Sequence, residues 1–276
     1  MAFFNTDWQH IADKCGINTW SRDKNDGSFH HLLESITKVP YNVLWGKDSL
    51  SRVSVAAKMS WAADRKTTRQ EDMAYCLIGI FGINMTMLYG EGERAFSRLQ
   101  EEIIRTSDDE SVFAWGFGRD TTLSRTRTRL VAASPADFKG CENVRLGSSF
   151  SRRRSTHYSL TNKGLLIERP LLILPRPFNS VLVPLTCCPS KDSDQVLALP
   201  LALPAREGLS DEDTCLSVSA ASLPVMVHPN FLKQHCSTKT RLYIRTTAYL
   251  RDQRPLPQIT AVTQFFAFVK RLPRTF

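Results

Sequence analysis

The stretch Ser54–Trp115 reads SVAAKMSWAADRKTTRQEDMAYCLIGIFGINMTMLYGEGERAFSRLQEEIIRTSDDESVFAW, and its apolar residues recur at helical spacing. Within it, Thr68 and Glu71 have the spacing of a capping box, in which the two side chains bind first-turn N–H groups reciprocally. They predict a helix that ends at Gly82, because glycine tolerates the left-handed conformation that follows many helices. The apolar face of this helix is expected to hold Met73, Leu77, Ile80 and Phe81.

Two further helices and one strand are expected in the same run. One helix lies within Ser51–Asp64, and the other follows the turn Gly90-Glu91-Gly92 and carries an apolar stripe. Val112–Phe117 has the pattern of a short buried strand. The stripe of the later helix consists of Phe96, Leu99 and Ile103.

Charge and composition divide the chain of 276 residues into two parts. The net charge of the whole chain is +9. Residues 1–118 have 13 basic and 16 acidic side chains, a net charge of −3. Residues 119–276 have 23 basic and 11 acidic side chains, a net charge of +12. All five tryptophans precede residue 116, and twelve of the fourteen prolines follow Arg169. Because proline is excluded from helix interiors, strands and loops are expected in the second part. We therefore predict a mainly helical domain over residues 1–117 and a β-rich domain over residues 118–276.

The second part carries a hairpin signal. Tyr158–Leu160 and Leu165–Ile167 flank Thr161-Asn162-Lys163-Gly164, in which Asn and Gly tolerate positive φ. The spacing of the other apolar runs predicts an antiparallel sandwich or open barrel. Further strands are expected at Val181–Thr186, Gln195–Leu199, Cys215–Ser219, Arg241–Thr247 and Gln264–Val269.

Neither a membrane span nor a signal peptide is expected. The longest apolar candidate, Val196–Ala205, contains two prolines and falls short of the roughly 20 residues that a membrane helix needs. The N-terminus reaches Asp7 before any basic residue, unlike a signal peptide. The seven cysteines are odd in number and include no Cys-x-x-Cys pair, which is typical of reduced cytosolic thiols. We therefore expect a cytoplasmic protein.

The run from Ser54 to Trp115 resembles the C-terminal part of the fungal heterokaryon-incompatibility (HET) domain, whose hallmark is a comparable MSWA…R.TTR.ED.AYCL.GIF.VNMPLLYGEG..AF.RLQEEI segment. The opening Phe3–Trp8 is similar to the family's segment just upstream. The region Tyr158–Leu165 resembles a β-rich domain of unknown function that often follows HET domains. The resemblance implies an α+β protein: the helical C-terminal portion of a HET domain, a domain related to Toll/interleukin-receptor (TIR) domains, followed by an antiparallel β-rich sandwich or barrel-like domain.

The chain departs from the family pattern in its first part. The LSHCWG and WID.LCI motifs of the family's N-terminal half do not occur in it, so the resemblance implies a truncated HET domain. Thr86 also stands where the family usually has proline.

The densest charged cluster within the HET-like run is Arg69-Gln70-Glu71-Asp72. Its residues Arg69, Glu71 and Asp72 are candidates for an interaction or ligand surface at a helix N-terminus. The alternative is helix capping, because the helix dipole favours acidic residues in a first turn. Tyr75 is a further candidate, or a core residue whose hydroxyl is hydrogen-bonded.

Tyr89-Gly90-Glu91-Gly92 is the second candidate motif. Helix N-termini attract anions, so a glycine turn before a helix suits a phosphate. However, Glu91 and Glu93 would repel a phosphate, and no Lys-Ser/Thr follows, so the motif is not a Walker loop. We expect a tight turn with Glu91 as a weaker site candidate, and no cofactor.

Two clusters later in the chain have simple interpretations. Arg152-Arg153-Arg154 add to a net charge of +7 over residues 119–169, which hold 11 basic and 4 acidic side chains. This basic patch suits phosphates or an anionic membrane surface, but a solvated loop is the preferred interpretation. Four residues have the types of zinc ligands in a spacing that matches no common zinc finger, so no metal site is expected. They are Cys215, His228, His235 and Cys236.

The resemblance implies a non-enzymatic signalling protein of fungal vegetative incompatibility, in which HET domains trigger a response to non-self that ends in cell death. No Gly-x-Ser-x-Gly or His-Glu-x-x-His motif occurs, and no catalytic residue is identified. Two alternatives stay open: a TIR-like NAD-cleaving enzyme fragment, and a basic module that binds anionic partners. We expect a protein partner, either the missing HET core or another signalling protein. No known nucleic-acid-binding module fits the sequence.

Overall fold

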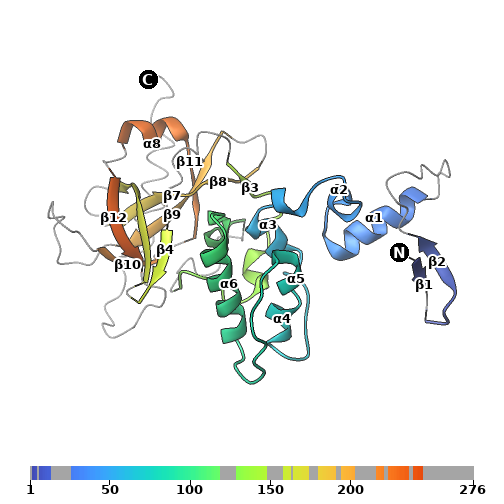
Figure 1. Cartoon of the computed structure of the whole chain (residues 1–276). Coiled ribbons are helices and arrows are strands. Elements are labelled where there is room, and N and C mark those ends of the chain that lie inside the picture. The colour runs from blue at the N-terminus through green and yellow to red at the C-terminus, as the bar shows by residue number, and fades with distance from the viewer. Residues whose placement is uncertain are drawn as a thin grey trace. The chain divides into compact units, whose positions relative to one another are not determined.

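The computed structural model describes the following residues: 2–4, 6–13, 26–118, 129–147, 158–162, 164–173, 180–190, 194–202, 216–220, 223–235 and 239–244. The chain separates into two compact units, Met1–Ser54 and Val55–Phe276. The predicted strand Gln264–Val269 lies outside the described residues. Figure 1 shows the elements of both units in chain order.

The first unit combines a small sheet with two helices. Its strands pair antiparallel. Trp45, which closes the second helix, is buried and stacks on Tyr41 with ring centroids 4.9 Å apart. The elements are β1 (Ala2–Phe4), β2 (His10–Asp13), α1 (Asp26–Thr37), α2 (Tyr41–Leu44) and the 3-10 helix η1 (Leu50–Arg52).

The HET-like run forms the helices at the start of the second unit. The predicted C-terminal stop at Gly82 is confirmed, since this residue closes a helix with a φ of +64°. The stripe predicted for the helix after Gly92 is confirmed as well, because its three apolar residues are all buried. The helices of the unit are α3 (Val55–Ser60), α4 (Asp72–Tyr75), α5 (Ile78–Phe81), α6 (Arg94–Thr106), η2 (Glu110–Phe113), η3 (Pro135–Phe138) and α8 (Pro229–His235).

Three local predictions are wrong. The single helix expected to end at Gly82 is divided into α4 and α5, with Cys76 and Leu77 between them. The capping box does not form: Glu71 is the N-cap residue of α4, and no side chain caps that helix. The strand expected at Val112–Phe117 is absent, and the 3-10 helix η2 overlaps its first half. Asp109 stabilises this helix, because its carboxylate accepts the backbone N–H groups of Ser111 at 2.9 Å and Val55 at 2.6 Å. These bonds turn the chain at the point where a strand would have to run straight.

The strands of the second unit confirm the β-rich prediction and the hairpin. In the hairpin, Thr161 of one strand pairs with Gly164 of the next. Four further predicted strands are present within a few residues of their expected positions, as β7, β9, β10 and β12. The strands are β3 (Arg145–Leu146), β4 (Tyr158–Thr161), β5 (Gly164–Pro170), β6 (Leu172–Ile173), β7 (Ser180–Pro184), β8 (Cys187–Cys188), β9 (Val196–Ala202), β10 (Leu216–Ala220), β11 (Val225–Val227) and β12 (Lys239–Ile244).

Within the described residues, most of these strands belong to one sheet of eight strands in the order β4-β5-β12-β10-β9-β7-β6, with β11 also paired to β9. The pairings in this sheet are antiparallel except that between β10 and β12, which is parallel. Strands β3 and β8 form a separate antiparallel pair. The α+β class is therefore confirmed, whereas the sandwich or barrel arrangement stays a prediction.

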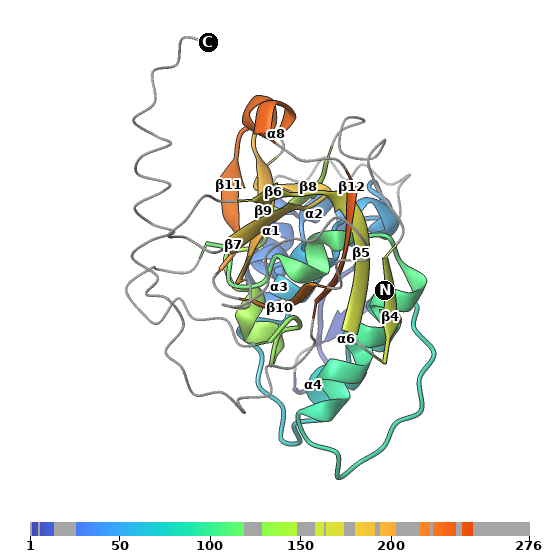
Figure 2. The ribbon, with the colours of Figure 1, turned by 90° about the vertical axis from the view of Figure 1, so that its left-hand side faces the viewer.

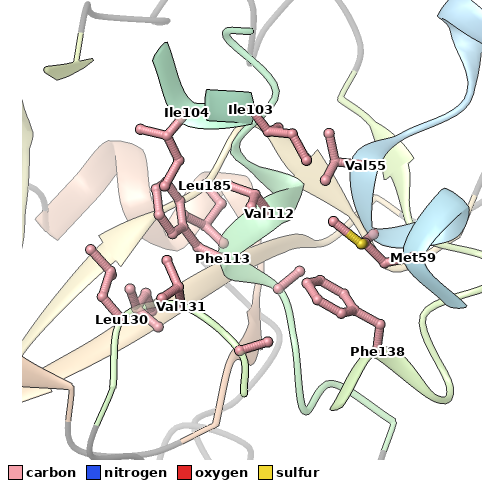
Figure 3. Packing of buried hydrophobic residues seen from close by; sticks show 14 of the residues in the cluster. Val55, Met59, Ile103, Ile104, Val112, Phe113, Leu130, Val131, Phe138 and Leu185 are labelled. Carbon is pink, nitrogen blue, oxygen red and sulfur yellow. The ribbon is translucent and has the colours of Figure 1, made fainter. Parts of the chain in front are cut away.

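One buried cluster joins the helices of the HET-like run to the sheet. Helix α6 lies beside β4 in both views (Figures 1 and 2), and its buried stripe belongs to the same cluster as Leu165 and Ile167 of β5. Figure 3 shows the cluster from close by, with Met59 of α3 facing Phe138 of η3. The apolar face of α6 therefore packs against the sheet. The expected domain boundary after residue 117 stays a prediction.

A buried ion pair also links the 3-10 helix η2 to the sheet. Glu110 of η2 and Arg169 of β5 are only 2% and 4% exposed. Arg169 Nη1 donates to Glu110 Oε2 at 2.9 Å, and Nη2 binds the other carboxylate oxygen. The backbone N–H of Thr186 donates to the same carboxylate at 2.8 Å. This carboxylate therefore fixes η2 against both β5 and the residues that follow β7.

Candidate functional site

The eight candidate residues of the HET-like run lie on or just before α4 and in the loop that joins α5 to α6, and hydrogen bonds and ring contacts connect them. Figure 1 shows the three helices α4, α5 and α6. We call residues 83–93 the clamped loop. Glu71 Oε1 accepts the backbone N–H of Gly90 at 2.7 Å and that of Gly92 at 3.0 Å. The side chain that was expected to cap α4 therefore binds the loop instead.

The two glycines let the loop present these N–H groups. Gly90 has a φ of +102° and Gly92 a φ of +59°, values that other residues adopt only under strain. A Cβ atom at Gly92 would also lie 3.2 Å from the side-chain oxygen of Gln70. The pKa of Glu71 lies below its usual value because its carboxylate accepts hydrogen bonds from backbone N–H groups. The largest effect comes from the N–H of Glu71 itself, followed by those of Gly92 and Gly90. The carboxylate is therefore the charged acceptor that the turn requires.

The hydroxyl of Tyr75 forms the second attachment point. It accepts the backbone N–H of Leu88 at 2.7 Å and lies 2.9 Å from both the carbonyl oxygen of Leu88 and Glu91 Oε1. A phenol has a single proton to donate, and a carboxylate is a stronger acceptor than a carbonyl oxygen, so the hydroxyl donates to Glu91. Partial burial, followed by the bond to Glu91, raises the pKa of Tyr75. The hydroxyl is thus held as a neutral donor and acceptor.

Arg98 of α6 forms the third attachment point. Its Nη1 atom pairs with Glu91 Oε1 at 2.5 Å, and its Nη2 atom donates to the carbonyl oxygen of Thr86 at 2.7 Å. The hydrogen bond from Arg98 is the main cause that lowers the pKa of Glu91, with a smaller contribution from the hydroxyl of Tyr75. One arginine therefore binds the clamped loop at two points, Thr86 and Glu91. It lies seven residues after Glu91, which precedes α6 in the loop, so helical spacing does not indicate this pair.

Tyr89 occupies the outer side of the same cluster. Its hydroxyl donates to Asp72 Oδ1 at 3.0 Å, and this bond is the first cause that raises the pKa of Tyr89. Its ring meets that of Tyr75 edge to face, with centroids 5.5 Å apart. The guanidinium carbon of Arg69 lies 4.9 Å from the centroid of Tyr89, a cation–π contact. All eight candidates therefore belong to one network.

The side chains of this network hold the clamped loop in position against α4 and α6. Glu71 accepts backbone N–H groups, Glu91 pairs with Arg98, and Asp72 accepts a phenol proton. Each of these carboxylates already binds a donor of the protein, as expected for groups that fix a loop. The loop also exposes three consecutive large apolar side chains: Met87, Leu88 and Tyr89 are 59%, 50% and 55% exposed. The sequence analysis did not single out Met87, Leu88 or Arg98.

The other candidates from the sequence do not join this site. Arg152, Arg153 and Arg154 lie outside the described residues, as do Cys215 and Cys236. Within the part of the chain that the structure describes, no three His, Cys, Asp or Glu side chains are grouped so that they could hold a metal ion. In the same part, no helix is both long enough and apolar enough to cross a membrane.

Comparisons with known proteins point in the direction of the sequence resemblance. Residues 94–195 match the model of a domain of unknown function, DUF8212, a range that begins at the first residue of α6 and ends just before β9. The chain is also 37% identical over 108 residues to the vegetative incompatibility protein HET-E-1 of Podospora anserina. This similarity covers 37% of the chain and 8% of that protein. No solved structure matches the chain.

Proposed function

We propose that this chain is a non-enzymatic signalling protein of fungal vegetative incompatibility. The observation that carries the proposal is the 37% identity over 108 residues to the vegetative incompatibility protein HET-E-1. The chain spans only 8% of the length of that protein, so the activity of the whole relative enters here as part of the proposal.

In this proposal the clamped loop and α4 form an interaction site for another protein. The network supports such a role because it stabilises one loop conformation and leaves apolar side chains exposed. Preformed surfaces of this kind lower the entropy cost of binding a partner. The residues that we assign to the site are Arg69, Glu71, Asp72, Tyr75, Tyr89, Gly90, Glu91 and Gly92.

The proposal includes the domain organisation and the compartment. We place the HET-like, TIR-related part in residues 1–117 and the β-rich accessory domain, arranged as a sandwich or barrel, in residues 118–276. We place the protein in the cytoplasm, where a partner in a cell-death response would meet it. The run Arg152-Arg153-Arg154 adds positive charge to the sequence of the second domain.

A chimera tests the incompatibility function. In Podospora anserina, the segment of HET-E-1 that aligns with this chain is replaced by the corresponding residues of the chain, and incompatible strains are confronted. We expect the chimera to give the growth arrest and cell death of the native protein. A deletion of the same segment is the matched control and should give neither. A chimera that accumulates to the native level and gives no response contradicts the proposal.

A separate measurement tests the non-enzymatic part. The purified chain is incubated with NAD, and the cofactor is quantified over time by chromatography. We expect the NAD concentration to match that of a buffer control. Consumption of NAD that scales with protein concentration would replace this part of the proposal by the TIR-like enzyme.

A further inference from the structure

The tip of the clamped loop exposes three consecutive large apolar side chains. Met87, Leu88 and Tyr89 are each at least half exposed, although the same unit buries most of its large apolar residues. Single exposed apolar residues are normal, but a contiguous group that is held in place calls for an explanation. We define these three residues as the apolar tip.

The backbone of the apolar tip is fixed on both sides. Arg98 binds the carbonyl oxygen of Thr86 at 2.7 Å just before the tip, and Glu71 binds the N–H of Gly90 at 2.7 Å just after it. Within the tip, the N–H of Leu88 donates to the hydroxyl of Tyr75 at 2.7 Å. Three side chains from two helices and the N-cap of α4 therefore hold the tip in one conformation. A surface prepared in this way binds with a smaller loss of conformational entropy than a free loop.

Charged groups of both signs lie beside the tip. The carboxylates of Glu71, Asp72 and Glu91 all accept hydrogen bonds from neighbouring groups. Arg69 is exposed, and its guanidinium contacts the ring of Tyr89 without an ion pair to any residue that the structure describes. Its N–H groups are therefore available to a carboxylate brought by a partner.

The size of the tip favours a short segment over a second copy of the chain. Three half-exposed side chains offer on the order of 300 Å², the size of a typical functional patch on a monomer. A stable dimer buries about 800 Å² on each partner. An extended or helical peptide that inserts one or two apolar side chains matches the smaller area.

We propose that the apolar tip and Arg69 bind a short segment of a partner protein that carries apolar side chains next to an aspartate or glutamate. The apolar side chains of the segment pack on Met87, Leu88 and Tyr89, and its carboxylate pairs with Arg69. This assignment rests on the proposed function in one respect, namely that the chain acts through a protein partner.

The test is a selection from a phage-displayed library of random 12-residue peptides on the purified chain. Selected peptides are synthesised, and their affinities are measured by fluorescence anisotropy. We expect sequences in which apolar residues neighbour Asp or Glu. Leu88→Asp should weaken binding at least about tenfold, as substitutions at the centre of an interface do. Arg69→Gln should weaken it by about tenfold and remove the preference for acidic peptides.

The matched control is Met226→Asp, which places the same charge at an apolar residue of β11 that is 47% exposed. It should leave binding unchanged. All variants are compared by circular dichroism and thermal melting, and Leu88→Asp should melt like the native chain because the Leu88 side chain is exposed.

Several results would overturn the proposal. A selection that yields no binders overturns it, as do selected peptides that are basic or that bind Leu88→Asp as well as the native chain. Binding to vesicles that contain 30% phosphatidylserine, if lost in Leu88→Asp, assigns the tip to a membrane surface instead. A dimer in sedimentation that dissociates in Leu88→Asp assigns it to self-association. None of these results bears on the growth arrest of the HET-E-1 chimera, so the failures of the two proposals are distinguishable.

Discussion

The carboxylate of Glu71 accepts the backbone N–H of Gly90, nineteen residues later in the chain, at 2.7 Å. The same oxygen accepts the N–H of Gly92 at 3.0 Å. An acidic residue at the start of a helix usually interacts with the N–H groups of that helix. Here the carboxylate instead completes a turn at the far end of the clamped loop. The position of α4 and the shape of the loop therefore depend on each other.

Replacing Glu71 should loosen the end of the loop. In Glu71→Ala the N–H groups of Gly90 and Gly92 lose their acceptor, so their amide hydrogens should exchange faster with solvent. Exchange in α6 beyond its first turn should not change. Hydrogen exchange resolved by NMR measures both. Glu102→Ala, which removes a surface ion pair with Arg105, is the matched control and should leave both glycine amides as they were.

The hydroxyl of Tyr75 should contribute to stability through two hydrogen bonds. Tyr75→Phe keeps the ring contact with Tyr89 and removes the bonds to Leu88 and Glu91. We expect a loss of about 1 kcal/mol in the free energy of unfolding, the usual net value of such bonds. Urea denaturation measures it. Tyr89→Phe should cost less, because the Tyr89 hydroxyl binds Asp72 at an exposed position. An equal or larger loss in Tyr89→Phe would contradict this ranking.

Acid should release the loop in a defined pH range. Hydrogen bonds lower the pKa of Glu71 and of Glu91 below the value of 4.5 for a free glutamate. Their contribution to the loop is therefore complete above pH 4.5 and is lost as the pH falls through the lowered pKa values. Burial raises the pKa of Asp109, which acts in the opposite direction on global stability, so a local measurement is required.

The amide proton shift of Gly90 provides that local measurement. We expect it to titrate with a midpoint below 4.5, the pKa of a free glutamate, and to be flat in Glu71→Gln. A midpoint above this value would mean that the carboxylate is not held in its charged form by the loop.

The elements that sequence patterns predicted well are those whose interactions are local. Helix α6 follows from the spacing of Phe96, Leu99 and Ile103, and the hairpin follows from the turn residues before Gly164. The failures involve distant partners. Asp109 turns the chain at η2 by binding the N–H of Val55, which lies 54 residues away in the sequence. No pattern within one segment contains that information.

The candidate site shows the same contrast between what local sequence predicts and what distant contacts decide. The sequence run identified Glu71, Tyr75 and Glu91 as candidates, but not what each of them binds. Those partners depend on how the loop folds back onto α4, which also decides that Met87 and Leu88 are exposed. Residue types thus located the site, and only the structure assigned its contacts.

The buried pair of Glu110 and Arg169 should be the most sensitive contact between the helices and the sheet. Arg169→Met leaves the carboxylate of Glu110 buried without its cation, so we expect a loss of about 3–5 kcal/mol in the free energy of unfolding. The double variant Glu110→Gln with Arg169→Met should recover part of this loss. The glutamine is uncharged and can still accept the N–H of Thr186. Urea denaturation of the single and double variants measures the coupling.

The ion pair between Lys139 and Asp64 supplies the control for that experiment. Its atoms lie 2.7 Å apart, but the two side chains are 63% and 60% exposed, so water screens the pair. Lys139→Met should therefore change the free energy of unfolding by less than about 1 kcal/mol. If Arg169→Met proves no more destabilising than Lys139→Met, the buried pair does not hold η2 against the sheet, and the apolar cluster alone joins the two.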